Sequence, residues 1–227
     1  MEDENVMNRR NFLKIFSVGA ATFFLSGCGL NAVAEEKNVH AKNISEGKIL
    51  KIVLINSSPH TEEKSTSRFL AKKFVEGAQS AGHEIFIFDA ANEDTHPCRG
   101  CDICGMDGDC VFNDAISRKL MPKMLEADLL VFVTPLYYYG MSSQLKIIVD
   151  RFYARTTKLN GKKSVFMATA WNSADWTLEA LKSHYETLVR YMNWEDCGQI
   201  WATGCGYRSA VENSEFADAA FKIGKNL

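Results

Sequence analysis

Residues 49–59, with the sequence ILKIVLINSSP, begin as a strand and end as a turn. The apolar run at the start is rich in β-branched residues, which is typical of a strand that is buried on both faces. Asn56-Ser57-Ser58-Pro59 has the composition of a turn. Ser65-Thr66-Ser67 then stands where a helix N-cap would, and apolar residues recur at helical spacing until Gly82. The stretch therefore predicts a strand, a loop and a helix in succession.

The rest of the chain continues this alternation. Further apolar runs predict strands at 84–89, 128–133 and 164–168, and the intervening patterns predict helices at 115–126, 145–152 and 178–192. A last strand and helix follow, and Pro122 predicts a break in the first of these helices. Parallel neighbours need crossover connections, so alternating strands and helices favour helices on both faces of a parallel sheet. The expected fold is α/β, a three-layer sandwich with a five-stranded parallel sheet.

Length and composition fit one soluble domain with an extension. The chain has 227 residues, of which 46% are hydrophobic and 24% are charged, and its formal net charge is -2. These are ordinary values for a globular domain. Without a basic excess, no nucleic-acid partner is expected.

The N-terminal residues have the pattern of an export signal. Arg9-Arg10 opens a twin-arginine motif, and the apolar run 15–25 that follows is shorter than the roughly 20 residues that cross a bilayer. We therefore expect residues 1–34 to be a twin-arginine signal. Residues 35–47 are expected to be a polar linker that need not pack, and residues 48–227 the folded domain.

The sequence contains two candidate sites for cleavage of the signal. Leu25-Ser26-Gly27-Cys28 resembles a lipobox, in which the cysteine would be acylated, and Ala32-Val33-Ala34 resembles an ordinary cleavage site. The first would anchor the protein to a membrane through lipid, and the second would release it. Both predict a periplasmic or cell-surface protein.

The loops that follow the strands contain the candidate binding residues, since ligands of open parallel sheets lie beyond the carboxyl ends of the strands. In the first loop, hydroxyls, backbone N–H groups and a helix N-terminus could hold a phosphate monoester. The alternative is that the hydroxyls only cap the helix and form a turn. The candidates in this loop are Ser58, His60, Ser65, Thr66 and Ser67.

A second loop is aromatic and could lie against a planar ring. It consists of Pro135, Leu136, Tyr137, Tyr138, Tyr139 and Gly140. Three adjacent tyrosines cannot all face the core, and the alternative to a ring site is an aromatic surface at a dimer interface. A third loop contributes Ala170 and Trp171, and Trp171 could close the other side of the ring or belong to the core.

These loops resemble those of the NADPH-dependent FMN reductase and iron-sulfur flavoprotein family of the flavodoxin-like superfamily. The resemblance rests on Asn56–Pro59 with Ser65–Ser67, on Pro135–Lys146 and on Asp150-Arg151, and it covers residue 48 to the C-terminus. It implies a flavodoxin-like fold and FMN, with the phosphate in the first loop and the isoalloxazine against the second. It also implies a homodimer or homotetramer with the flavin near a subunit interface.

The first loop departs from the family pattern. Ser57 replaces the usual glycine, His60 replaces the usual arginine, and Glu62-Glu63 is an acidic insert. Less positive and more negative charge should weaken phosphate binding unless Lys64 or His60 compensates.

Four cysteines form a compact C-x2-C-x2-C-x5-C motif, which consists of Cys98, Cys101, Cys104 and Cys110. Thiolates at this spacing could converge on a [4Fe-4S] cluster, and the motif resembles that of iron-sulfur flavoproteins. The alternatives are a zinc site, disulfides or free thiols, and a loop inherited without a cluster. Cys197 and Cys205 are expected to be buried core thiols.

The resemblance implies an FMN-dependent oxidoreductase that transfers electrons from a reduced donor to an acceptor. The family's donor is NAD(P)H, which is cytoplasmic, so an exported protein would take electrons from a quinol or a redox-protein partner. The alternative is a flavin electron carrier or flavin-binding module without a substrate of its own. No residue is expected to act as a catalytic acid or base, because FMN itself supplies the redox chemistry.

Overall fold

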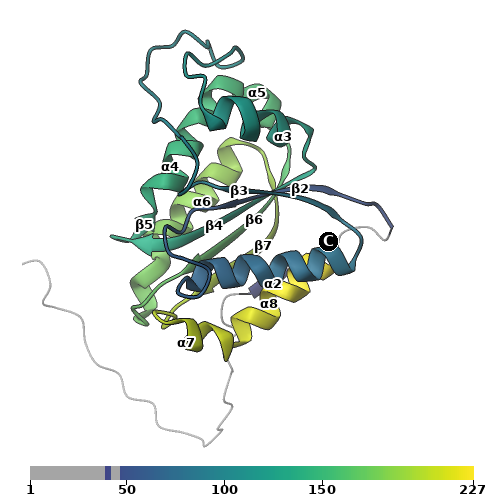
Figure 1. Cartoon of the computed structure of the whole chain (residues 1–227), viewed down its shortest axis with the longest axis vertical. Coiled ribbons are helices and arrows are strands. Elements are labelled where there is room, and N and C mark those ends of the chain that lie inside the picture. The colour runs from purple at the N-terminus through teal and green to yellow at the C-terminus, as the bar shows by residue number, and fades with distance from the viewer. Residues whose placement is uncertain (1–38, 42–46) are drawn as a thin grey trace, which may run out of the picture. The chain divides into compact units, whose positions relative to one another are not determined.

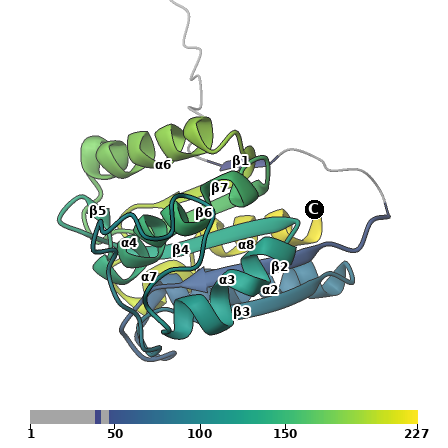
Figure 2. The same cartoon turned by 90° about the horizontal axis from the view of Figure 1, so that it is seen from above.

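The computed structural model describes residues 39–41 and 47–227, which form one sheet with helices on both faces (Figure 1). The strand order is β1-β7-β6-β4-β2-β3, with β5 paired to β4, and Figure 2 shows it from β1 to β3. The pairs β3–β2, β2–β4, β4–β6 and β6–β7 are parallel, so the expected five-stranded parallel sheet is confirmed. The strands are β1 (Val39–Ala41), β2 (Lys51–Asn56), β3 (Glu84–Asp89), β4 (Leu129–Tyr137), β5 (Gly140–Met141), β6 (Lys163–Thr169) and β7 (Glu195–Ala202).

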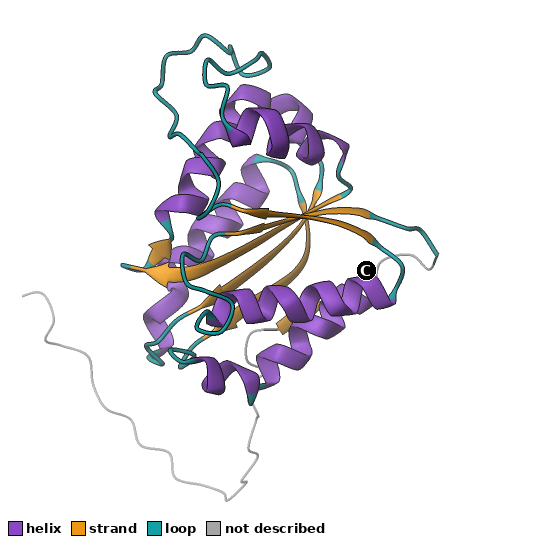
Figure 3. Ribbon diagram, viewed as in Figure 1, coloured by secondary structure: helices purple, strands orange, loops and turns teal. Residues whose placement is uncertain are grey.

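The helices bury apolar side chains on both faces of the sheet. The α-helices are α2 (Thr66–Ser80), α3 (Met121–Glu126), α4 (Ser143–Asp150), α5 (Thr156–Leu159), α6 (Glu179–Tyr191), α7 (Arg208–Glu212) and α8 (Glu215–Lys225). The segments η1 (Ile116–Leu120), η2 (Arg151–Arg155) and η3 (Asp175–Leu178) are π or 3-10 turns. One hydrophobic core unites α2, α7 and α8 with the sheet, and another unites α3, α4 and α6 with its opposite face. This is the expected three-layer sandwich (Figure 3).

Two helix boundaries lie at the residues from which they were predicted. The Ser65 hydroxyl accepts the Arg68 N–H at 3.0 Å and caps α2, which ends shortly before Gly82 with its φ of +85°. Pro122 lies in the first turn of α3, where a missing N–H costs little, and η1 precedes it. The break expected at Pro122 is therefore a change from a π turn to an α-helix.

Glycines let α2 and α8 approach closely. A Cβ on Gly77 would lie 2.0 Å from the carbonyl oxygen of Phe221, and one on Gly224 would lie 2.2 Å from that of Phe74. The absence of a side chain at both positions allows the short distance between the two helices.

The order of the strands places a crevice beside β2. The chain passes from β2 to β3 on one side and then to β4 on the other, so the loops after β2 and β4 diverge at their carboxyl ends. Such a switch point is where open α/β sheets bind ligands.

The structure adds a strand to the segment expected to be an unpaired linker. Val39–Ala41 forms β1, which pairs antiparallel with Gly198–Ile200 of β7. A run of three residues is too short to show strand periodicity, so no pattern in the sequence predicts this strand. Residues 1–34, with the expected twin-arginine signal, lipobox and cleavage site, lie outside the described residues.

Candidate functional site

A cavity of about 600 Å³ opens at the carboxyl ends of β2, β4, β6 and β7, and we call it the strand-end cavity. This volume lies within the range of small-molecule and cofactor pockets. The residues that line it are Ser58, His60, Glu63, Lys64, Ser65, Thr66, Ser67, Pro135, Leu136, Tyr137, Thr169, Ala170, Trp171, Cys205, Gly206, Tyr207 and Arg208.

The first loop (residues 56–67), whose last two residues begin α2, brings its hydroxyls together at one end of the cavity. Ser65 Oγ donates to Ser58 Oγ at 2.7 Å and lies 3.3 Å from Ser67 Oγ. Thr66 Oγ1 donates to Thr169 Oγ1 at 2.9 Å, which ties the start of α2 to the end of β6. The predicted hydroxyl side chains therefore lie close together in the cavity wall. Ser65 also caps α2.

Arg68 holds the backbone of this loop. Its guanidinium donates to the carbonyl oxygens of His60 at 2.7 Å and Ser58 at 2.8 Å, and pairs with Asp89 at 2.7 Å. The loop is therefore fastened to the end of β3. Arg68 was not predicted, because an arginine in the first turn of a helix has no sequence pattern that identifies its partners.

The aromatic loop is divided between the cavity and the solvent. Pro135, Leu136 and Tyr137 line the cavity, and partial burial raises the pKa of the Tyr137 hydroxyl above its usual value. Tyr138 and Tyr139 form the two-residue turn between β4 and β5, and Tyr138 is completely exposed.

Three predicted residues therefore lie outside the cavity lining, namely Tyr138, Tyr139 and Gly140. The backbone conformations in the β4–β5 turn explain why these three residues do not line the cavity. Tyr138 and Tyr139 have φ angles of 45° and 63°, as a tight hairpin turn requires, whereas Gly140 does not have a positive φ. The backbone freedom expected of the glycine is thus needed by the two tyrosines.

Further aromatic rings stand at the rim of the cavity. Trp171 is 72% exposed and packs edge-on against Tyr207, with ring centroids 5.4 Å apart. A Cβ on Gly206 would lie 2.7 Å from the Trp171 ring, so only glycine leaves room for this ring. Trp171 is thus a rim residue and not part of the core.

The loop after β7 is the part of the cavity that sequence analysis missed. It contributes Cys205, Gly206, Tyr207 and Arg208 to the lining. A signal was available, because β7 was a predicted parallel strand and its carboxyl end had to lie at the same edge of the sheet. Cys197 and Cys205 are buried, as expected, and burial raises the pKa of Cys197 to about 12.

The four predicted metal ligands lie on the long loop between β3 and η1, which we call the cysteine loop (residues 97–113). It is the extended loop that leaves the body of the fold in Figure 3. Cys98 and Cys101 are exposed, Cys104 and Cys110 are half-buried, and all four are free thiols. Among the described residues, no three Cys, His, Asp or Glu side chains gather in a way that could hold a metal ion.

The segment that follows α4 fastens the cysteine loop. Tyr153 Oη donates to Asp102 Oδ1 and Thr157 Oγ1 to Asp107 Oδ2, both at 2.5 Å. Arg155 Nη1 donates to the carbonyl oxygen of Asp107 at 2.7 Å. Several hydrogen bonds therefore hold the loop to the body of the fold. None of its cysteines lines the strand-end cavity, whereas Cys110 lines a separate cavity of about 310 Å³.

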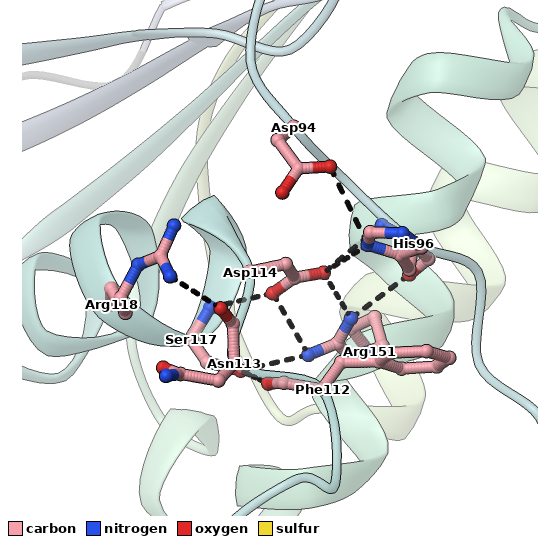
Figure 4. Close-up of polar contacts among 8 residues, drawn as sticks. All are labelled: Asp94, His96, Phe112, Asn113, Asp114, Ser117, Arg118 and Arg151. Atoms are coloured by element: carbon pink, nitrogen blue, oxygen red, sulfur yellow. Dashed lines mark hydrogen bonds and ion pairs between the residues drawn. The ribbon is translucent and has the colours of Figure 1, made fainter.

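A buried ion pair closes the base of the cysteine loop (Figure 4). Arg151 donates to Asp114 Oδ2 at 2.7 Å, to the His96 carbonyl oxygen at 2.9 Å and to Ser117 Oγ at 2.8 Å. The side chains of Arg151 and Asp114 are 2% and 1% exposed. Since His96 precedes the loop and Asp114 follows it, the pair joins the two ends of the loop.

The pKa of Asp114 lies below its usual value as a result. Burial alone would raise this pKa, but the hydrogen bonds from Arg151 and from the N–H groups of Ser117 and His96, with the Arg151 charge, outweigh that effect. Arg151 belongs to a motif that the sequence shows, whereas Asp114, 37 residues away, was not predicted.

In the part of the chain that the structure describes, no helix has the length and apolar character needed to span a membrane.

Several solved structures share the fold. The NAD(P)H:quinone oxidoreductase from Methanothermobacter marburgensis has a TM-score of 0.64 at 18% identity, over 79% of this chain and 96% of that one. The azoreductase from Bacillus anthracis has a TM-score of 0.57 at 16% identity, over 79% of this chain and all of that one (100%). At such identities the likeness concerns the fold.

Curated relatives resemble the chain over a shorter range. An iron-sulfur flavoprotein of Methanocaldococcus jannaschii is 31% identical over 102 residues, which are 45% of this chain and 51% of that protein. An iron-sulfur flavoprotein of Archaeoglobus fulgidus is 35% identical over 102 residues, again 45% of this chain and 48% of that protein. The chain thus matches about half the length of these relatives.

The family match extends further than these pairwise matches. Residues 50–195 match the NADPH-dependent FMN reductase family, from just before β2 to the first residue of β7. This range contains the first loop, the aromatic loop and the cysteine loop, together with the central strands between them. The chain therefore belongs to the NADPH-dependent FMN reductase family.

Proposed function

We propose that the chain binds FMN in the strand-end cavity and acts as an FMN-dependent oxidoreductase. The observation that carries the proposal is that a hydroxyl cluster at a helix N-terminus and a set of aromatic rings line one cavity at the switch point of the sheet. The two ends of this cavity differ as the two ends of FMN do, since a phosphate needs hydrogen-bond donors and an isoalloxazine needs apolar contact.

Each end of the cavity has a defined task in this proposal. The hydroxyls of Ser58, Ser65 and Ser67 and the first N–H groups of α2 bind the phosphate. Leu136 and Tyr137 lie beside the ring system, and Trp171 shields it from water. Bound FMN supplies the redox chemistry, because it accepts electrons in pairs and releases them singly or in pairs.

The proposed electron donor is NAD(P)H, which the family name indicates. If the chain is exported, the proposed donor is a quinol or a redox protein, because nicotinamides are cytoplasmic. Rapid reduction of the bound flavin by one of these donors, followed by turnover with an acceptor, would support an enzyme. Reduction without turnover would favour the alternative of an electron carrier.

We also propose that the four cysteines of the cysteine loop take up a [4Fe-4S] cluster. Their spacing and the names of the relatives in Methanocaldococcus and Archaeoglobus support this. The described positions of the thiols do not fit a cluster, since they do not converge, and uptake would require them to move together. About four irons and matching sulfide per chain after anaerobic purification would support the cluster. A chain without iron would leave the thiols free, disulfide-bonded or zinc-bound.

Replacement of Ser65 by alanine tests the phosphate end of the cavity. Ser65→Ala removes a helix cap, which should cost about 1 kcal/mol of stability, and should also weaken FMN binding. Thr187→Ala is the control, because the exposed Thr187 hydroxyl donates to the Ser183 carbonyl oxygen within α6 and does not line the cavity. FMN titration by fluorescence should show weaker binding only for Ser65→Ala. Equal FMN affinity in the two variants would place the phosphate elsewhere.

A further inference from the structure

If the strand-end cavity holds FMN, the charged residues of the first loop do not by themselves balance the charge of the phosphate. A phosphate monoester carries about -1.5 to -2 charges at neutral pH. The first loop contributes the carboxylate of Glu63 and the ammonium group of Lys64 to the cavity wall. These two opposite charges offset each other, so the first loop supplies little net positive charge to a phosphate.

We propose that Arg208, from the loop after β7 and the start of α7, supplies the positive charge that binds the FMN phosphate. This inference rests on the proposed function and specifies which residue outside the first loop completes the site. Arg208 lines the same cavity as Ser58, Ser65 and Ser67.

The contacts of Arg208 place it at the phosphate end of the cavity. Its guanidinium carbon lies 4.2 Å from the centroid of the Phe69 ring, and Phe69 is in the first turn of α2. Nη1 donates to the carbonyl oxygen of Glu62 in the first loop. These two contacts hold the guanidinium next to the helix N-terminus that the phosphate would approach.

One edge of the guanidinium is left for a ligand. Nε donates to Glu212 Oε1 at 2.7 Å and Nη1 to Glu62. Within residues 47–227, no hydrogen bond engages Nη2. Arginine has five N–H donors in a rigid fork, so the other groups can fix the side chain while Nη2 donates to a phosphate oxygen.

The charge of Arg208 also reaches Glu63. The pKa of Glu63 is lowered first by its own backbone N–H and the Thr61 hydroxyl, and then by the charges of Arg208 and Lys64. Both basic residues line the cavity, but they differ in kind. Lysine presents a mobile point charge, whereas the fixed fork of Arg208 suits a phosphate better.

The test is the difference between FMN and riboflavin, which lacks the phosphate. The full chain and its Arg208→Gln variant are titrated with each flavin by fluorescence quenching at low and moderate salt. We expect Arg208→Gln to weaken FMN binding about tenfold to a hundredfold, as the loss of one charged hydrogen bond would. Riboflavin affinity should change less than about threefold, and the salt dependence of FMN binding should decrease.

Two further variants complete the experiment. Arg208→Lys should restore part of the FMN affinity, because the charge returns without the fork. Arg190→Gln removes the same charge from an exposed position outside the cavity and should leave both affinities unchanged.

The outcomes separate the inference from the proposed function. Equal weakening of FMN and riboflavin in Arg208→Gln would mean that Arg208 only supports the loop, and unchanged FMN affinity would mean that the phosphate is balanced elsewhere. Either result overturns the inference and leaves the flavin site intact. If the unmodified chain bound neither flavin, the proposed function would fail, and the inference with it.

Discussion

At the scale of single residues, Arg151 and Asp114 are joined by an ion pair that is almost completely shielded from water. A buried pair of this kind is expensive to break, because removal of one partner leaves a charge without compensation. The pair connects the two ends of the cysteine loop, so its loss should affect the loop as well as the stability of the fold.

Asp114→Asn should lower the free energy of unfolding by about 3–5 kcal/mol, since Arg151 would remain charged and buried. Urea denaturation monitored by circular dichroism would measure this. Lys146→Gln is the control, because Lys146 pairs with Asp150 on the surface and such pairs contribute about 0.5 kcal/mol. A loss for Asp114→Asn as small as that of the control would show that the buried pair is not important for stability.

The low pKa of Asp114 predicts a pH dependence with a definite sign. A carboxyl group whose folded pKa lies below its ordinary value of 3.8 stabilises the fold above that value. This contribution is lost as the pH falls through the lower folded pKa. The stability difference between the unmodified chain and Asp114→Asn should therefore shrink as urea titrations move from about pH 6 towards pH 3. A difference that stayed constant over this range would contradict the assignment.

The residues of the candidate site were predictable only where local sequence specifies them. Ser65 could be placed because a hydroxyl before a helical repeat is an N-cap, and the structure confirms the cap. The loop of Arg208 could be placed at the carboxyl end of β7, but its contact with Glu62 and that of Asp114 with Arg151 could not be predicted, because these partners are remote in sequence. No local pattern encodes a contact across such distances.

At the scale of elements, the turn of the β4–β5 hairpin consists of two tyrosines, a residue type that rarely has a positive φ. Tyr138 and Tyr139 replace the asparagine or glycine that such turns prefer. Left-handed conformations cost residues with a Cβ about 1–2 kcal/mol. The hairpin therefore holds conformational strain beside the cavity.

Tyr138→Gly should relieve part of this strain and raise the free energy of unfolding by about 0.5–1 kcal/mol. The substitution removes no packing contact within the chain, because the Tyr138 ring is fully exposed. Tyr191→Gly is the matched control, since Tyr191 is an exposed tyrosine in a helix, where glycine costs up to about 1 kcal/mol. The two variants should shift the urea midpoint in opposite directions. A lower midpoint for Tyr138→Gly would indicate that the ring has a partner, such as a second copy of the chain.

The close crossing of α2 and α8 predicts that replacing a glycine of α2 by alanine lowers the stability of the protein, although alanine has the higher helix propensity. Gly77→Ala would ordinarily stabilise a helix, but the new methyl group would collide with the Phe221 carbonyl. We expect a loss of about 1–3 kcal/mol, measured by urea denaturation. Gln79→Ala, on the exposed side of the same helix, should be nearly neutral. A gain in stability for Gly77→Ala would show that the helices can separate without cost.

Element types were predictable because strands and helices differ in the spacing of their apolar residues. The five parallel strands and the break at Pro122 follow from that spacing and from the chemistry of proline. β1 and β5 were not predictable, because runs of three and two residues show no period. The hairpin was also missed, since its turn lacks the usual glycine or asparagine.

At the scale of the whole molecule, the proposed location outside the cytoplasm depends on residues 1–34. A chain in which Arg9 and Arg10 are both replaced by lysine should stay in the cytoplasm, because the twin-arginine pair is the recognised feature. Cell fractionation and immunoblotting would measure this, with Lys37→Gln as a control that removes a basic residue outside the motif. Normal export of the double variant would contradict a twin-arginine route.

Loss of the lipid should be separable from loss of export. Cys28→Ala should still be exported if the lipobox is used, but it should be found in the soluble fraction instead of the membrane fraction. An unchanged distribution would favour the ordinary cleavage site at Ala32-Val33-Ala34.

The most direct test of the proposed function is the flavin content of the full chain after anaerobic purification. Ultraviolet-visible absorption would detect bound flavin, and release and chromatography would identify and count it. We predict about one FMN per chain, held in the strand-end cavity at the switch point of the sheet. A chain that contained no flavin, and took up none when FMN was added, would contradict the account.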